Sequence, residues 1–506
     1  MAPQEYPLFK AEVDVDAFPV TYNYMVKFDE SKTETEQFQR QREKGAESLN
    51  EFFNRSITVK KHPELPRAYE AFQYFEPSKL YDDSFVATIV VKCDENQLNS
   101  LYQDTDSVEK IAAEVIYASP YTVKTFKEAK FGLSGESTRE VPKLSYRIKN
   151  LKNAGKELYN RTSLKLRAEH MDVSYLRDKI YADQENPIYK ASCDENDGVY
   201  GDLGYYGDDV SNQMYDAYSY KGDDKTQNEE AHIAQDIIPL VKAIDDYKNG
   251  SSNNFPLDAD TFLKSMALEF LAGAIDNYWN KPGNYFLYKD NSKNQWYFHD
   301  ADFHYTFGIN YREDVMLNTP LSEYPPADEN IKKERPPLDA LRSHPENETK
   351  FKGIIERLLK TSFNEKALFP RIDSMAELIR EDAQWDISIT PKENPNPTSG
   401  RNMAENIETF DKEAKSEEES GFNGGFTFKY FIKTRISLVA SELNIEVPAD
   451  YEKNLGTVTT PYANVKSDKK DGKKGKDAKS ASIKTMVWNK HCWTLAIAFI
   501  MAIFFY

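Results

Sequence analysis

The chain has 506 residues, a formal net charge of −18 at pH 7 and 40% hydrophobic residues. This length is sufficient for two or three domains, and the hydrophobic content supports a folded core. The acidic balance argues against nucleic-acid binding, which requires basic surfaces. The 32 tyrosines and 29 phenylalanines favour a β-rich protein with an aromatic core. Three scattered cysteines (Cys93, Cys193 and Cys492) indicate neither a zinc site nor a disulfide framework. A disulfide between Cys93 and Cys193 is an alternative that the spacing of the cysteines does not indicate.

Residues 1–60 are expected to form short β-strands. Apolar and aromatic side chains recur there at every second position, at Val20, Tyr22, Tyr24 and Val26. The opening sequence, MAPQEYPLFKAEVD, has neither a basic nor an apolar region and is therefore not a signal peptide. Leu65-Pro66 marks a linker to the next part of the chain.

The segment from 67 to 183 is rich in predicted strands. β-Branched and alternating runs predict strands over Ser84–Lys92, Ala113–Ile116 and Tyr121–Phe126, with helical or loop segments at Asp94–Leu101 and Ser107–Ile111. A small-residue turn, Phe131–Arg139, then precedes a strand over Pro142–Lys149. A glycine-bearing turn beside a strand lysine, Lys143, could cover the phosphates of a nucleotide, although strand lysines are usually only solvated.

A strand and a helix follow this turn. Leu164 and Leu166 alternate as in a strand, and Leu176 and Ile180 give Val173–Asp183 an apolar helix face. On this helix, Arg177 and Asp178 could hold the lysine or the phosphates; the alternative is that both are solvated helix charges.

Residues 190–230 are acidic and rich in glycine and tyrosine. They lack the oxygen rhythm and terminal glutamate of an EF-hand, so a surface loop is expected. Ala231–Lys248 follows as an amphipathic helix, with Ile237, Val241 and Ile244 on one face.

The stretch Gly273–Gly308 carries the most informative motifs of the chain. It follows a helix that Asp258 caps, and it contains a turn at Asn280–Gly283. Two β-rich runs, Tyr285–Lys289 and Trp296–Phe303, predict a hairpin with a six-residue loop.

The expected register of this hairpin brings oxygen-bearing side chains together. If Tyr288 faces Tyr297, Asn284 lies nearly opposite Asp302, where opposed Cα atoms are about 5 Å apart. Asp276 arrives at the same end from the helix terminus, and Asp300 would share the strand face of Asp302. Such oxygen ligands suit Mg²⁺ or Mn²⁺, and phosphoryl transfer needs that metal and a carboxylate to orient the acceptor hydroxyl. The alternative is a turn or a solvated strand edge, the commoner role of an Asp-x-Asp sequence.

Residues 251–447 are expected to be mainly helical. Helices are predicted over Phe351–Leu359, Leu368–Trp385 and Gly425–Leu443, with a mobile polar loop over Pro391–Glu418. Residues 448–482 form a Lys/Asp/Gly/Ser tract that cannot bury a core and is expected to be a flexible stalk.

Residues 483–506 are predicted to be a GPI-attachment signal. The pattern begins with three small residues, Ser480, Ala481 and Ser482. A polar spacer and the uncharged 14-residue tail Trp493–Tyr506 follow, and attachment is predicted at Ser480. The tail is shorter than the roughly 20 residues of a spanning helix, and the alternatives are a short tail anchor or a buried helix. GPI attachment requires secretion, so either the start of this chain is truncated or the GPI interpretation is wrong. Four glycosylation sequons agree with secretion, at Asn54, Asn160, Asn249 and Asn347.

These motifs resemble those of the CotH family, the spore-coat protein H-like atypical kinases. The family pairs an aspartate at a helix end with an Asn-Tyr-x-Leu-Tyr strand and an aspartate shortly before Phe-Gly. The corresponding residues here are Asp276, Asn284–Tyr288 and Asp302, which precedes Phe307-Gly308. The resemblance implies that Asp276 is the catalytic carboxylate and that Asn284 and Asp302 bind Mg²⁺ or Mn²⁺.

The resemblance extends to the preceding segment. The family has a Gly–Ser turn followed by a Lys-x-Ser-Tyr/Phe strand, which implies that Lys143 binds the phosphates of ATP and that Arg177 supports it. A strand pair that completes the N-terminal lobe in the family is missing here after Gln184. That departure leaves nucleotide binding, and therefore enzyme activity, open.

The implied fold is α+β, a bilobal kinase-like domain. A β-sandwich remnant over 1–60 precedes an N-lobe with a lobe-connecting insert over 61–250 and a helical C-lobe over 251–447; the stalk and the GPI signal follow. The implied activity is Mg²⁺/ATP-dependent phosphorylation of protein hydroxyls. The alternative is a non-catalytic, GPI-anchored adhesin or invasin that binds a host-cell surface protein, because the stretch is most similar to the fungal cell-surface branch. In both cases the membrane would be reached through the lipid anchor.

Overall fold

The structure is a computed structural model in which helices and strands are mixed, as the predicted α+β class requires. It describes residues 2–5, 7–69, 79–135, 137–153, 156–159, 161–168, 172, 174–176, 189–222, 226–290, 294–309, 313–328, 331–389, 393–398, 406–453 and 455. The fold contains two large hydrophobic cores, one built from residues 80–166 and one mainly from residues 175–439.

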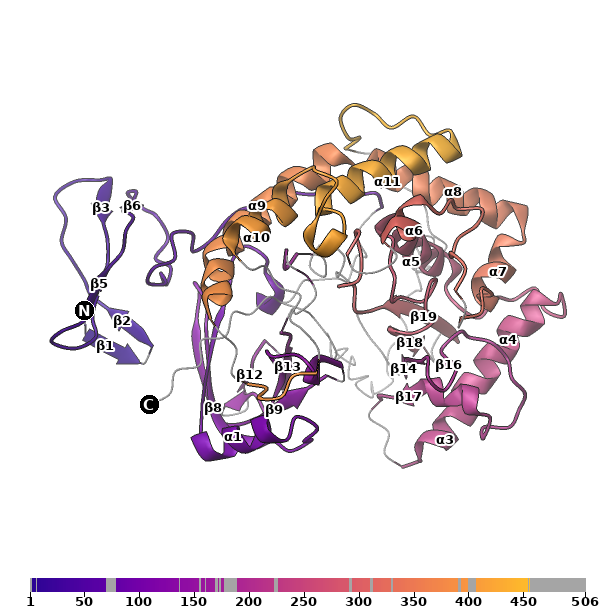
Figure 1. Ribbon diagram of the computed structural model, residues 1–506, viewed down its shortest axis with the longest axis horizontal. Coiled ribbons are helices and arrows are strands. Elements are labelled where there is room, and N and C mark those ends of the chain that lie inside the picture. The colour runs from indigo at the N-terminus through magenta and orange to yellow at the C-terminus, as the bar shows by residue number, and fades with distance from the viewer. Residues whose placement is uncertain are drawn as a thin grey trace, which may run out of the picture.

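The first 60 residues form three separate two-stranded antiparallel ribbons. These pair β1 (Ala2–Glu5) with β2 (Leu8–Lys10), β3 (Val20–Tyr22) with β6 (Arg40–Arg42), and β4 (Met25–Lys27) with β5 (Thr33–Thr35). They lie together at one end of the molecule, beside the N-terminus (Figure 1). The expected short strands are therefore present, but as ribbons rather than as one sheet.

The first core is covered by a five-stranded antiparallel sheet in the order β13-β10-β9-β8-β7. Its strands are β7 (Thr88–Cys93), β8 (Ile111–Ala118), β9 (Val123–Ser134), β10 (Ser145–Lys149) and β13 (Ser163–Leu166). Helix α1 (Glu95–Gln103), capped by Asp94, packs Leu98 and Leu101 into this core. Two short strands, β11 (Lys152–Asn153) and β12 (Lys156–Glu157), pair beside it.

Two expectations about this sheet need correction. The small-residue segment expected to be a turn belongs in part to β9, which continues to Ser134, so the turn begins only at Gly135, whose φ is +98°. Lys143 lies in the bend before β10 rather than on the strand.

The second core contains a four-stranded sheet in the order β17-β14-β18-β19. Its strands are β14 (Tyr189–Ala191), β17 (Tyr218–Tyr220), β18 (Tyr285–Asp290) and β19 (Gln295–Asp300), and the small hairpin of β15 (Cys193–Asp194) and β16 (Val199–Tyr200) lies between β14 and β17 in the sequence. The expected surface loop over 190–230 is therefore wrong, because this segment supplies two strands of the sheet. Leu203, Tyr215 and Tyr218 from it are buried, so the second core begins before the predicted boundary at 250/251.

Helices surround this second sheet. They are α3 (Glu229–His232), which continues through a π-helical turn (Ile233–Ile237) into α4 (Ile238–Lys248), and then α5 (Ala259–Ala272), α6 (Glu313–Asn318), α7 (Pro336–Arg342), α8 (Pro345–Lys360), α9 (Glu365–Ser388), α10 (Ile407–Lys415) and α11 (Phe428–Leu443). Short 3-10 turns are at Lys79–Tyr81, Ser137–Arg139, Gln213–Ala217 and Phe422–Gly424. The segment expected to be a polar loop over Pro391–Glu418 thus contains a helix, α10.

Helix α9 connects the two cores. It extends across the top of the view toward the five-stranded sheet (Figure 1). Near its C-terminus Asp386 binds Lys143 and accepts a hydrogen bond from the Tyr175 hydroxyl, and Asp382 pairs with Arg55.

Several predicted features lie outside the described residues. These are Ser480 with the GPI signal, most of the stalk, Arg177 and the sequon residue Asn160. Asn54 and Asn249 are exposed and Asn347 is half-buried in the first turn of α8. Cys93 and Cys193 are both free thiols, so the disulfide left open between them is not formed. Within the described ranges, no helix combines the length and apolarity needed to cross a membrane.

Candidate functional site

Helix α5 determines where Asp276 lies. Asp258 caps the helix by accepting a hydrogen bond of 2.8 Å from the Thr261 amide, and Gly273 ends it in the left-handed conformation, with φ of +58°. A Cβ atom at Gly273 would lie 2.5 Å from Cζ of Phe431 on α11. The close contact between α5 and α11 therefore fixes the point at which the chain turns toward Asp276.

The hairpin β18–β19 brings the other two predicted residues to the same place. Its register pairs Tyr288 with Tyr297, as predicted. Beyond the last strand pair, the Ala301 amide donates a 2.8 Å hydrogen bond to the Asn284 carbonyl, which places Asp302 beside Asn284. Asn284 and Asp302 have left-handed backbones, with φ of +55° and +67°, a conformation that asparagine and aspartate tolerate better than other side chains do.

Asn284 links Asp276 to this end of the hairpin. Its Nδ2 donates to Asp276 Oδ2 at 2.9 Å and to the Asp276 carbonyl at 2.8 Å. Lys281 holds the other carboxylate oxygen of Asp276 at 3.1 Å and also contacts Glu195 Oε1 at 2.6 Å. Burial would lower the pKa of the Lys281 ammonium, but Asp276 and Glu195 outweigh that effect and raise it.

Asp302 is held by two basic side chains. Its Oδ2 pairs with Nη2 of Arg167 and its Oδ1 contacts Nδ1 of His304, while Arg167 Nη1 lies 2.9 Å from the same histidine nitrogen. Burial alone would raise the pKa of the Asp302 carboxyl, but the charges of Arg167 and His304 hold it well below its usual range. The ionised form of Asp302 is therefore favoured by its two basic neighbours.

Sequence reasoning missed the basic residues that face Asp302. Arg167 follows β13, and Lys165 lies on it, opposite Arg147 of β10. Burial lowers the pKa of the Lys165 ammonium, and the positive charges of Arg167, Lys190 and Arg147 lower it further. The negative charge of Asp302 raises this pKa. The signal was present in the family-like run Leu-Lys-Leu-Arg, but which strand face it occupies depends on sheet pairing.

The structure places Lys143 elsewhere. Its ammonium pairs with Asp386 of α9, and its side chain is mostly buried there, with 16% exposed. In the described residues, Lys165 and Arg167 are the basic side chains of the five-stranded sheet whose charges act on Asp302. The nucleotide-binding roles of Lys143 and Arg177 stay predictions.

Asp300 does not share the environment of Asp302. Strand β19 ends at Asp300, and the left-handed backbone at Asp302 breaks the alternation that would have put both on one face. Instead, Asp300 faces the fully buried Glu269 of α5, whose other oxygen accepts a hydrogen bond of 2.7 Å from the Trp279 amide. Burial, followed by the mutual repulsion of the two carboxyls, raises the pKa of Glu269 well above its usual value, and burial raises that of Asp300.

The donor set of Asp276, Asn284 and Asp302 fits a hard divalent cation, because all three side chains carry oxygen. Each carboxylate has basic side chains in contact with it, Lys281 at Asp276 and Arg167 with His304 at Asp302. In the ranges that the structure describes, no group of three or more His, Cys, Asp and Glu side chains could hold a metal. Mg²⁺ is commonly bound by one or two carboxylates with substrate phosphates as further ligands, which matches this set.

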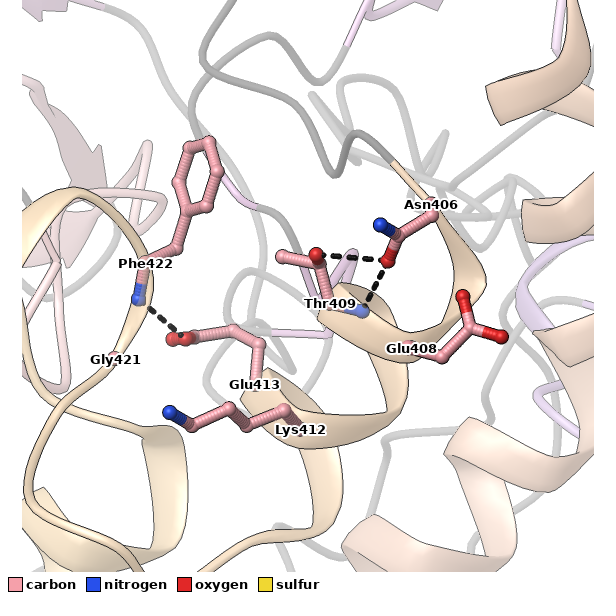
Figure 2. Close-up of a pocket in the computed structure, with 7 residues that line it drawn as sticks. All are labelled: Asn406, Glu408, Thr409, Lys412, Glu413, Gly421 and Phe422. Carbon is pink, nitrogen blue, oxygen red and sulfur yellow. Dashed lines mark hydrogen bonds between the residues drawn. The ribbon is translucent and has the colours of Figure 1, made fainter.

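A separate pocket of about 410 Å³ lies on α10 (Figure 2). It is lined by Asn406, Glu408, Thr409, Lys412, Glu413, Gly421 and Phe422. Glu413 accepts a hydrogen bond from the Phe422 amide at 3.1 Å, and Asn406 caps the helix through the Thr409 amide at 2.8 Å, as the dashed lines show. These polar groups are paired with one another, and none of the predicted site residues lines the pocket.

Comparison with known proteins agrees with the resemblance found in the sequence. The family model described as CotH kinase protein matches residues 132–188 and 181–417, which together make up more than half of the chain. The two matched stretches overlap at residues 181–188.

Among curated proteins, the chain is similar to several from Rhizopus delemar. It is 26% identical to spore coat protein homolog 1 over 389 residues, 68% of this chain and 63% of that protein. It is 23% identical to invasin CotH3 over 459 residues, or 79% of this chain and 74% of that protein, and 22% identical to invasin CotH2 over 467 residues, or 80% and 75%. The chain thus spans less than two thirds of the length of the first of these relatives.

Proposed function

Because the chain belongs to the family of CotH kinase proteins, we propose that it transfers a phosphoryl group from ATP to protein hydroxyls at the site of Asp276, Asn284 and Asp302. The observations that support this most are the hydrogen bond between Asn284 and Asp276, the backbone pairing of Asn284 with Ala301 next to Asp302, and the ion pair of Asp302 with Arg167 at the end of β13. A carboxylate pair facing lysine and arginine is the arrangement that a metal-bound, multiply charged phosphate ester requires.

Each side chain has a role in this proposal. Asp276 orients the acceptor hydroxyl and accepts its proton, while Lys281 keeps the carboxylate in place. Asn284 and Asp302 would hold Mg²⁺ or Mn²⁺, which when bound neutralises charge on the transferred phosphoryl group. Lys165 and Arg167 supply positive charge for the phosphates from the opposite side.

The bilobal kinase-like arrangement is part of the same proposal. The five-stranded antiparallel sheet with α1 and the largely helical second core are two separate hydrophobic units, and the ion pair between Arg167 and Asp302 lies between them. A nucleotide bound at this junction would contact both units. That would explain why basic residues come from one core and carboxylates from the other.

The test is divalent-dependent ATP binding and phosphotransfer by the whole chain, compared with Asp302→Ala. We expect activity in the parent and a loss of at least 100-fold in the variant, because the metal would lose its charged ligand. Asp209→Ala is the matched control. It removes an exposed carboxylate from the segment between β16 and β17 and should keep full activity. A folded parent protein that neither binds ATP nor transfers phosphate would refute the proposal.

A non-catalytic adhesin or invasin is the second candidate function. Two of the relatives are named invasins, and half of the exposed large apolar side chains in the described residues lie between residues 9 and 28. These are Phe9, Val13, Val15, Phe18, Met25 and Phe28. Exposed apolar groups concentrated in one small region are typical of a protein-contact surface, here for a host-cell surface protein.

Attachment to the cell surface through a GPI lipid at Ser480 belongs to both candidates. The names of the invasin relatives support a surface-related role, and the small residues, spacer and apolar tail support the lipid. Release of the protein from intact cells by a phosphatidylinositol-specific phospholipase would support the anchor. Protein that stays with the membrane after Ser480 and its small neighbours are replaced would contradict it.

A further inference from the structure

We propose that Arg167 is a built-in counter-cation of Asp302 that makes metal binding depend on nucleotide binding. In the absence of nucleotide, the guanidinium neutralises the carboxylate and opposes a divalent cation. When phosphates arrive, Arg167 exchanges Asp302 for them and frees the carboxylate for the metal. This inference rests on the proposed function, because it concerns the same site.

The contacts of Asp302 support the first step. Arg167 pairs with Oδ2 of Asp302 and His304 contacts Oδ1, so both carboxylate oxygens have basic partners. The Arg167 side chain is only 12% exposed and that of Asp302 28%. An ion pair that is partly shielded from solvent is less screened than an exposed pair, so a metal ion that approached Asp302 would be repelled by the guanidinium.

The surroundings of Arg167 support the second step. Arg147 lies opposite Lys165 in the β10–β13 pair, and the charges of Arg167, Lys190 and Arg147 lower the pKa of the Lys165 ammonium, so Arg167 belongs to a group of basic side chains around Lys165. A triphosphate carries enough negative charge to interact with several members of this group at once. An arginine also binds phosphate oxygens through paired N–H groups as readily as it binds carboxylate.

The position of Arg167 makes such an exchange possible without unfolding either core. Arg167 follows the end of β13 in the first core, and Asp302 follows the end of β19 in the second. Their ion pair therefore connects two units through side chains at strand ends. Exchange of partners needs only a change in the torsions of a long side chain, while the backbones stay in place.

Two binding measurements on the whole protein test this without requiring catalysis. Mn²⁺ binding in the absence of nucleotide is followed by electron paramagnetic resonance, and ATP binding in EDTA is followed by calorimetry. In Arg167→Gln, we expect Mn²⁺ to bind about tenfold more tightly, since a like charge in contact with the ligand is removed. Metal-free ATP should bind about tenfold more weakly, since a phosphate partner is lost.

Arg147→Gln is the matched control. It removes a positive charge from the same cluster, but Arg147 is exposed on β10 and shows no ion pair with Asp302 among the contacts of the described residues. It should weaken metal-free ATP slightly and leave Mn²⁺ binding within about twofold. Asp302→Asn should abolish Mn²⁺ binding in either background.

Opposite changes in the two affinities, confined to Arg167→Gln, would support the inference. Unchanged or weaker Mn²⁺ binding in that variant, or an equal gain in Arg147→Gln, would overturn it. If Arg167→Gln does not fold, Arg167→Met replaces it: this side chain also removes the positive charge, so Mn²⁺ should again bind about tenfold more tightly, and equal affinity would overturn the inference. Opposite changes without phosphotransfer would refute only the kinase proposal, whereas phosphotransfer without them would refute only the role of Arg167.

Discussion

At the scale of single residues, Glu269 and Asp300 form a carboxyl pair inside the second core. Glu269 is fully buried, Asp300 faces it, and the pKa of each carboxyl responds to a side-chain hydrogen bond with the other. Two carboxylates cannot both be ionised at such a place, so the pair shares a proton at neutral pH. This pair supports the turn that carries Asp276, because Glu269 also binds the Trp279 amide.

The pair predicts a specific dependence of stability on pH. Burial raises the pKa of Glu269, and that of Asp300 to about 7, above their values in the unfolded chain. A carboxyl whose pKa is raised by folding contributes stability that is complete below its unfolded pKa and is lost as the pH rises through the folded pKa. We therefore expect the free energy of unfolding to fall between about pH 4 and pH 7 by several kcal/mol.

Glu269→Gln should remove the part of this slope that Glu269 contributes, because the amide stays neutral at every pH, whereas burial keeps the part that Asp300 contributes. Urea unfolding of parent and variant at pH 5 and pH 8 measures the difference. Glu114→Gln, which breaks a partly exposed ion pair with Lys92, should leave the slope unchanged. A parent slope that the Glu269→Gln substitution does not reduce would show that other groups determine it.

The sequence predicted part of the site at this scale, and physical reasons explain the rest. The sequence predicts that Asp276, Asn284 and Asp302 lie close together, because the end of a helix and the register of two strands are local relationships. Arg167 could not, because it reaches Asp302 from another sheet and another core, across 135 residues of sequence. Asp300 was placed on the wrong face because a left-handed aspartate breaks strand periodicity in a way that residue type alone does not reveal.

At the scale of elements, the left-handed end of α5 is the feature on which the position of Asp276 depends. Gly273→Ala would place a methyl group against the Phe431 ring in a backbone conformation that costs an L-residue about 1 kcal/mol or more. We expect a loss of about 2–4 kcal/mol in the free energy of unfolding, measured by urea titration.

Gly250 provides a matched control for this change. It also has a positive φ, of +79°, but nothing lies within 4 Å of the Cβ it would gain. Gly250→Ala should therefore lose only the conformational part, about 1 kcal/mol. Equal losses in the two variants would show that contact with α11 does not fix the end of α5.

Local signals explain which elements could be predicted. The cap at Asp258, the apolar spacing of α5 and the paired aromatic residues of β18 and β19 lie within a few residues of each other, and these elements were predicted correctly. The strands β14 and β17 were missed because each is three residues long and is stabilised by a partner far away in the sequence. Helix α10 was missed because it lies inside a segment whose composition is polar and rich in proline.

At the scale of the whole molecule, the contact between α9 and the first half of the chain is largely polar. Arg55 forms an ion pair with Asp382, and Lys60 forms one with Glu377. The His62 ring is hydrogen-bonded to Ser374, so residues 55–62 contact the helix through polar side chains. These pairs differ in burial: the Arg55 and Asp382 side chains are 14% and 8% exposed, whereas those of Lys60 and Glu377 are 25% and 55% exposed.

Burial should decide what each pair contributes. Asp382→Asn leaves the Arg55 guanidinium buried without a charged partner and should lower the free energy of unfolding by about 2 kcal/mol or more. Glu377→Gln should change it by less than about 1 kcal/mol, because that pair is exposed to solvent. Urea unfolding monitored in both cores measures this. A larger loss in the Glu377 variant would mean that burial does not govern this interface.

The order of strands in the second sheet has a consequence for synthesis of the protein in the cell. Strand β14 pairs on one side with β18, and Tyr189 lies opposite Leu287, 98 positions later (287 − 189 = 98). At a translation rate of about 5–20 residues per second, Tyr189 of β14 is made roughly 5–20 seconds before Leu287 of β18, the strand with which it pairs. During that interval an apolar strand edge is open to other nascent chains. Expression at high ribosome density should therefore favour aggregation, and chaperones that bind extended apolar segments should counteract it.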